Sequence, residues 1–150
     1  WSFRPNQVIA IGLEFPIVEQ DEGGKIVREV AERLLTPRGL RTLCPSDDRY
    51  KGRYIGDPLS RDAAYHQGTV WPWLLGPYTK AVARYGDSAL QRQLQEIIFG
   101  FESHFMEAGL GNISEIFDGD APHLPRGCVA QAWSVAQILE SALSLLGDKG

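Results

Sequence analysis

The residues from Tyr65 to Trp73, read as YHQGTVWPW, limit the fold of this chain more than any other stretch. Pro72 lacks an amide hydrogen, so it is tolerated only in the first turn of a helix. The apolar run that follows, as far as Tyr85, is therefore predicted to be a helix whose first turn contains this proline. Thr69 is predicted to be its N-cap residue, with a hydroxyl that accepts from the free amides of the first turn.

The residues just before this helix combine polar groups with large aromatic rings. The side chains that can hydrogen-bond to a hydroxylated ligand are those of Tyr65, His66 and Gln67. Beside them, apolar ring faces come from Trp71 and Trp73. A capped and well-packed helix start that binds nothing explains the same residues equally well.

Apolar residues recur at helical spacing in five segments, and no segment shows the alternation of a strand. The predicted helices cover residues 5–14, 21–35, 70–85, 88–107 and 128–146. Residues 36–67 have no sustained period. Loops of that length inside a compact domain are usually functional or disordered, and the aromatic and arginine residues of this one argue against disorder.

The unusual loops precede alternate helices. Residues 4–6, 65–73 and 114–126 lie before the first, third and fifth predicted helix. In a layered ring of helices, alternate helices point the same way, so the three loops would gather at one mouth. The expected fold class is all-α, and this pattern favours a ring of helix pairs over a simple bundle.

Composition excludes several classes of function. The chain has 150 residues, enough for one domain. Its net charge is −4 and it has no basic run, which argues against nucleic-acid binding. No apolar run approaches the ~18 residues of a membrane span. Two cysteines suit a reducing compartment such as the cytoplasm. The chain opens at Trp1 with no signal-like segment, which suggests a piece of something longer.

Three carboxylates lie close together between Ser114 and Asp120. Glu115 is flanked by apolar residues and is expected to be partly desolvated, which suits a residue that transfers protons in glycoside hydrolysis. An ordinary loop acid is the alternative. Asp118 and Asp120 lack the regularly spaced oxygen ligands of a calcium loop, and the three histidines lie far apart in the sequence. No metal or cofactor site is predicted.

Several long motifs resemble the C-terminal domain of bacterial and archaeal glycogen debranching enzymes, the amylo-α-1,6-glucosidases. They occur in the family's order and cover almost the whole chain. They are Arg4-Pro5-Asn6-Gln7, Leu43-Cys44-Pro45-Ser46-Asp47, Tyr50-Lys51-Gly52, residues 65–73, residues 113–120, and Arg126-Gly127-Cys128 followed after one residue by Ala130-Gln131-Ala132-Trp133-Ser134.

The resemblance implies an (α/α)6 toroid, as in glucoamylase-like enzymes, that cleaves α-1,6-linked glucose with inversion. Glu115 matches the family's general base. The residues that would line the sugar site are Tyr65, His66, Gln67, Trp71 and Trp133, with Asn6 and Asp118 as further candidates.

The same resemblance implies that this chain is incomplete. The family's general acid belongs to a segment well upstream of the Arg4 motif, and five helices are fewer than twelve. We therefore expect part of a toroid, inactive alone, whose partners are a branched α-glucan (glycogen or limit dextrin) and the remainder of the parent enzyme. Two alternatives stay open: a non-catalytic helical module that binds glucan or protein, and another toroid glycosidase such as a trehalase-like enzyme.

Overall fold

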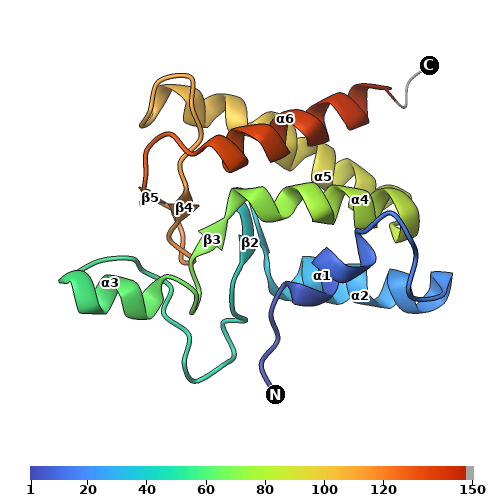
Figure 1. The fold of residues 1–150 in the computed structure, drawn as a ribbon, viewed down its shortest axis with the longest axis horizontal. Coiled ribbons are helices and arrows are strands. Elements are labelled where there is room, and N and C mark those ends of the chain that lie inside the picture. Colours follow the sequence, from blue (N-terminus) through green and yellow to red (C-terminus); the bar gives the residue numbers. More distant parts are fainter. Residues whose placement is uncertain (148–150) are drawn as a thin grey trace.

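The computed structural model describes residues 1–147, which form six α-helices, two short 3-10 helices and five short strands (Figure 1). In chain order these are α1 (Asn6–Ile11), α2 (Gln20–Arg33), β1 (Leu35–Thr36), β2 (Gly39–Arg41), α3 (Pro58–Ala64), β3 (Val70–Trp71), η1 (Pro72–Leu74), α4 (Leu75–Tyr85), α5 (Ser88–Gly100), η2 (Phe101–Met106), β4 (Ile116–Phe117), β5 (Pro125–Arg126) and α6 (Ala132–Gly147).

Helix α4 is the centre of the core. It contacts α1, α2, α5 and α6, and Figure 1 shows it between α6 on one side and the pair α1 and α2 on the other. Leu75, Tyr78, Ala81 and Val82 are fully or almost fully buried. Because side chains on several sides of α4 are buried, the other helices are held in place by packing against it.

Each of the five predicted helices is present, although the exact ends differ. The start of the third one was predicted wrongly at Thr69. Pro72 does open the first turn, but that turn is the 3-10 helix η1 and its N-cap residue is Trp71. The Thr69 hydroxyl instead donates to the carbonyl oxygen of Tyr65 at 2.6 Å. Val70 and Trp71 are in strand β3, which keeps Thr69 away from the helix amides.

The absence of strands was also predicted wrongly. The five strands form one antiparallel sheet in the order β1-β2-β3-β4-β5. Its central pairings place Leu40 opposite Trp71, Val70 opposite Phe117, and Ile116 opposite Arg126. Each strand has only two or three residues, so alternation has no length in which to show in the sequence.

Helix α3 lies inside the segment that was expected to be irregular. The Asp57 carboxylate accepts from the amide of Ser60 at 2.8 Å, and Pro58 occupies the first turn, so the helix has a well-formed start. Of its residues only Ala64 is buried. Without a buried apolar stripe, the helix had no periodic signal in the sequence.

The fold is therefore mainly helical, as expected, with a small antiparallel sheet at one end of the helices that was not expected. Figure 1 shows strands β2 to β5 beside the ends of α4 and α6, with α3 beyond them. Among residues 1–147, no helix combines the length and apolar character needed to cross a membrane.

One face of α6 remains uncovered. Ser134, Ile138 and Ser141 point into the molecule, whereas Leu139, Leu143 and Leu146 are 56%, 60% and 55% exposed. An apolar groove of about 530 Å³ runs between α5 and α6 beside this face. Contiguous exposed apolar surface of this kind favours association.

We predict that the isolated 150-residue chain self-associates through α6. Replacing Leu139 and Leu143 by lysine should shift the chain toward monomer in sedimentation velocity, because two charges would have to be buried in the contact. Lysines at exposed Gln91 and Gln93 of α5 add similar charge elsewhere and should leave association unchanged. A wild-type chain that sediments as a monomer at all concentrations would contradict the prediction.

Candidate functional site

The three loops that the sequence singled out do meet in space. Arg4 contacts the backbone of His66 and the side chain of Gln67, and Tyr65 contacts Glu115. The short sheet brings the second and third loops together, since β3 lies inside the second loop, β4 lies inside the third, and the two strands pair. The gathering of the loops was thus predicted correctly, and the sheet that produces it was not foreseen.

Glu115 is held from two sides. The Tyr65 hydroxyl donates to its Oε1 atom at 2.5 Å, and the backbone amide of Cys128 donates to its Oε2 atom at 3.0 Å. The backbone amide of Glu115 donates in turn to the carbonyl of Cys128 at 2.8 Å. The side chain is half-buried, as expected. Its carboxylate therefore has a fixed orientation and keeps access to solvent.

An open cleft of about 760 Å³ surrounds the Glu115 carboxylate, within the size range of small-ligand sites. Arg61 of α3 and Arg126 of β5 line it from two sides. The full lining is Tyr54, Ile55, Gly56, Arg61, Glu115, Pro125, Arg126, Gly127 and Cys128. The apolar groove between α5 and α6 is smaller, at about 530 Å³, and its lining contains one ionisable side chain, Glu102, so the chemistry is better placed in the cleft at Glu115.

A cluster of aromatic rings extends from the cleft toward α6. The Tyr65 ring lies 4.8 Å from the rings of both His66 and Trp71, and His66 stacks on Trp71 at 5.3 Å. Trp71 meets Trp133 edge-on at 5.7 Å. Trp71 is buried, whereas His66 is exposed and Trp133 is 45% exposed. The last two therefore present ring surface to a ligand, and Trp71 supports them.

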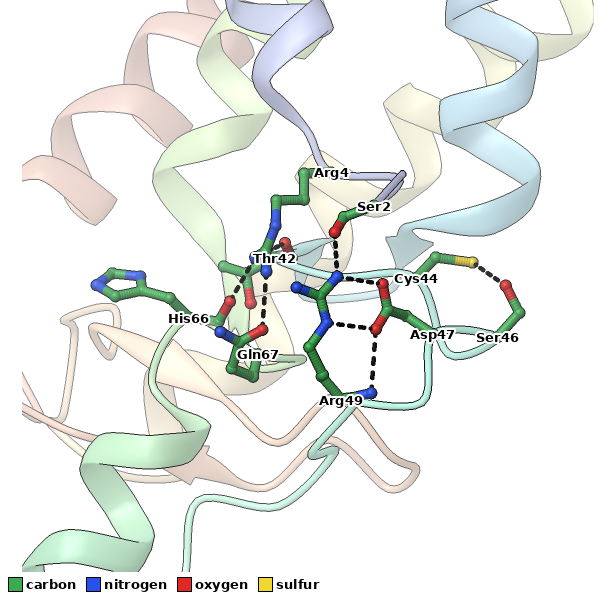
Figure 2. A network of polar contacts seen from close by, with 9 residues as sticks. All are labelled: Ser2, Arg4, Thr42, Cys44, Ser46, Asp47, Arg49, His66 and Gln67. Atoms are coloured by element: carbon green, nitrogen blue, oxygen red, sulfur yellow. Dashed lines mark hydrogen bonds and ion pairs between the residues drawn. The ribbon is translucent and has the colours of Figure 1, made fainter.

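Arg4 fixes the polar part of the same loop, as Figure 2 shows. Its guanidinium donates to the carbonyl oxygens of Thr42 at 3.0 Å and His66 at 2.7 Å, and to Oε1 of Gln67 at 2.8 Å. The Gln67 amide oxygen is thus occupied, which leaves its NH₂ group for other partners. Asn6 lies exposed at the start of α1, and no hydrogen bond within residues 1–147 links its side chain to this cluster.

A second arginine in Figure 2, Arg49, holds the N-terminal segment of the chain against the turn at residues 44–49. Arg49 pairs with Asp47 at 2.8 Å and also donates to the Ser2 hydroxyl. Hydrogen bonds from Arg49 hold the pKa of Asp47 well below its usual range. The contact keeps residues 2–4 beside the site, so Arg4 can reach His66 and Gln67.

Asp118 is 4% exposed, and both of its carboxylate oxygens are engaged. Arg126 donates to Oδ2 at 2.9 and 3.1 Å, and the backbone amide of Tyr54 donates to Oδ1 at 2.8 Å. These contacts hold two lining residues of the cleft. A direct role in substrate binding stays a prediction for Asp118, whereas its positioning of Tyr54 and Arg126 is visible.

Sequence reasoning missed Tyr54, Arg61, Arg126 and Cys128 as lining residues. Arg126 and Cys128 stand in the motif before α6, which was a usable signal. Tyr54 and Arg61 lie in the segment without a periodic pattern, where no sequence signal pointed to a site. Within residues 1–147, no group of three or more histidine, cysteine, aspartate or glutamate side chains is placed to hold a metal ion.

Gly127 permits the close packing around the carboxylate. Its φ is 66°, in the left-handed region that favours glycine. A Cβ atom there would lie 2.3 Å from Oε2 of Glu115 and 3.1 Å from Cγ1 of Ile116. Any larger residue would have to displace the Glu115 side chain.

Two comparisons with known proteins give matches over most of the chain. A family model described as amylo-alpha-1,6-glucosidase matches residues 1–140. A protein named glycogen debranching enzyme from Saccharomyces cerevisiae is 27% identical over 161 residues, which cover 93% of this chain and 10% of that protein. The chain thus spans about a tenth of the length of this curated relative.

We predict that Gly127→Ala destabilises the chain more than Gly111→Ala does. Both glycines have positive φ, so both variants lose roughly 1–2 kcal/mol to backbone strain. Only at position 127 does the new methyl group also collide with Glu115, whereas position 111 has open space. Urea unfolding of both variants measures the difference in free energy of unfolding. Equal losses would show that the methyl group does not meet the carboxylate.

Proposed function

Because the chain belongs to the amylo-alpha-1,6-glucosidase family, we propose that it forms part of the site that hydrolyses α-1,6-linked glucose at the branch points of glycogen or limit dextrin. The single observation that carries the proposal is the Glu115 carboxylate, oriented by Tyr65 and Cys128 and open to a solvent-filled cleft. A carboxylate in that setting is what a hydrolase needs to activate water.

In this proposal Glu115 is the general base of an inverting reaction. It takes a proton from a water molecule whose oxygen attacks the anomeric carbon of the branch glucose. A second carboxylic acid on the opposite face protonates the departing glycosidic oxygen, and inverting enzymes hold the two groups roughly 6.5–9.5 Å apart. Asp118 is tied to Arg126 and Tyr54, so we assign the acid to the remainder of the parent enzyme.

The aromatic cluster would bind the sugar. The exposed faces of His66 and Trp133 suit the C–H edges of a glucose ring, with Trp71 beneath them, and the Gln67 NH₂ group can donate to a hydroxyl. Tyr65 and Asn6 remain candidates at the edge of this surface. The substrate class, a branched α-glucan, rests on the family together with this combination of rings and polar groups.

We further propose that the described helices are the C-terminal part of an (α/α)6 toroid. The exposed apolar face of α6 supports this, because a neighbouring helix of the toroid would cover it. The remainder of the parent enzyme would then supply both that helix and the general acid. A cytoplasmic location also fits the proposal, since Cys44 and Cys128 are both free thiols.

The first test is Glu115→Gln in the full-length enzyme. Glutamine keeps the size and one acceptor oxygen but cannot take a proton, so kcat should fall by about 10²–10⁴-fold. KM should change little, because His66 and Trp133 still bind the sugar. Steady-state kinetics on one branched oligosaccharide measures both constants.

Two neighbouring carboxylates provide the controls. Asp120→Asn removes an exposed charge from the same loop and should leave kcat nearly unchanged. Asp118→Asn weakens the contact with Arg126, so thermal stability should fall together with activity. If Glu115→Gln keeps a normal kcat while the variant of Asp118 or Asp120 loses activity, the base is that aspartate and not Glu115.

The second test uses the isolated chain. We predict that it releases no glucose from limit dextrin, because one carboxylate provides only half of the inverting chemistry. Retained glucan binding without hydrolysis, measured by calorimetry, is expected. Glucose release by the pure chain that disappears in its own Glu115→Gln variant would overturn the assignment of the acid to another segment.

A further inference from the structure

We propose that Tyr65 is a positioning residue for Glu115, and that it sets the direction in which the carboxylate accepts a proton. This inference rests on the proposed role of Glu115 as the base and gives Tyr65 a different task from sugar contact. The geometry points to it because Tyr65 contributes the only side-chain hydrogen bond to Glu115 within residues 1–147.

Contacts other than the one with Glu115 also hold Tyr65 in place. Its backbone carbonyl accepts from the Thr69 hydroxyl at 2.6 Å and from Nε1 of Trp71 at 3.1 Å. Its ring packs against the rings of Tyr54, His66 and Trp71 at 4.8 to 5.8 Å. With both backbone and ring held, the hydroxyl has little freedom to leave the carboxylate.

The hydroxyl keeps its proton over the range in which enzymes work. Burial, and then the neighbouring Glu115 carboxylate, raise the pKa of Tyr65 well above its usual range. Tyr65 is therefore a constant donor and not a second base. The 2.5 Å separation of the two oxygens is typical of a hydrogen bond from a hydroxyl to a charged carboxylate.

Each oxygen of the Glu115 carboxylate accepts a hydrogen bond from a different donor. Cys128 donates to Oε2 from the main chain, and Tyr65 donates to Oε1 from a side chain. Each oxygen retains a further lone-pair direction for water. With one donor on each oxygen, the carboxylate plane is defined. With Cys128 alone, the group could turn about a single contact.

Loss of the hydroxyl leaves the Glu115 carboxylate less well oriented. Misplacement of a reacting group by about 1 Å can cost roughly 10²-fold in rate, so the lost orientation should slow the reaction.

The decisive experiment is Tyr65→Phe in the full-length enzyme, which keeps the ring and its packing. We expect kcat to fall by about 10- to 100-fold, the range for loss of a hydrogen bond to a charged group, with KM nearly unchanged.

Tyr50→Phe is the matched control. It removes a tyrosine hydroxyl that donates to Asp120 in the same loop at 3.1 Å, without touching Glu115. Its kcat and KM should match those of the wild type, and circular dichroism melting checks that both variants fold.

The outcomes separate the two proposals. If Glu115→Gln is inactive but Tyr65→Phe keeps its kcat, the positioning role is wrong and the function of Glu115 stands. If Tyr65→Phe raises KM alone, Tyr65 binds sugar instead. If Glu115→Gln remains active, the proposed base is wrong, whatever Tyr65→Phe does.

Discussion

The pairing of Val70 with Phe117 is the constraint on which the site depends. It joins the strand that leads into the central helix α4 to the strand that begins directly after Glu115. Tyr65 lies five residues before one of these partners, and Glu115 lies two residues before the other. Because backbone hydrogen bonds fix the pairing of β3 with β4, only short segments separate the sheet from the Tyr65 hydroxyl and the Glu115 carboxylate.

Buried polar contacts then secure the loops around the sheet. Asp118 is nearly inaccessible to water, and an unpaired charge in that position would be costly. Its two oxygens are satisfied by Arg126 and the amide of Tyr54, so both walls of the cleft are tied to one carboxylate. The neighbouring Glu115 differs because one face remains open. Three residues apart in the sequence, one carboxylate holds the loop and the other faces the cleft.

Sequence analysis predicted the helices well because they are long and have apolar stripes, as in α5 with Leu90, Leu94 and Ile98. It failed for elements too short to have a period, namely the strands and α3. At the site, Arg4, Tyr65 and Glu115 lie in loops that precede alternate helices, and from that order the loops were correctly predicted to gather. Tyr54 and Arg61 were missed because they reach the cleft through contacts with residues far away in the sequence, and such contacts produce no local sequence pattern. The wrong capping role for Thr69 has the same origin, since strand β3 was not foreseen.

The contact between Glu115 and Cys128 involves the main chain of residue 128 and not its thiol. Almost any amino acid can provide that amide, and proline is the exception, since it has no amide hydrogen. Position 65 has no such freedom, because only a side chain with a hydroxyl at the reach of tyrosine can make its bond. The two supports of one carboxylate thus differ in how much sequence variation each permits. The side chain at position 128 can vary with the ligand that the cleft binds, without loss of the hydrogen bond to Glu115.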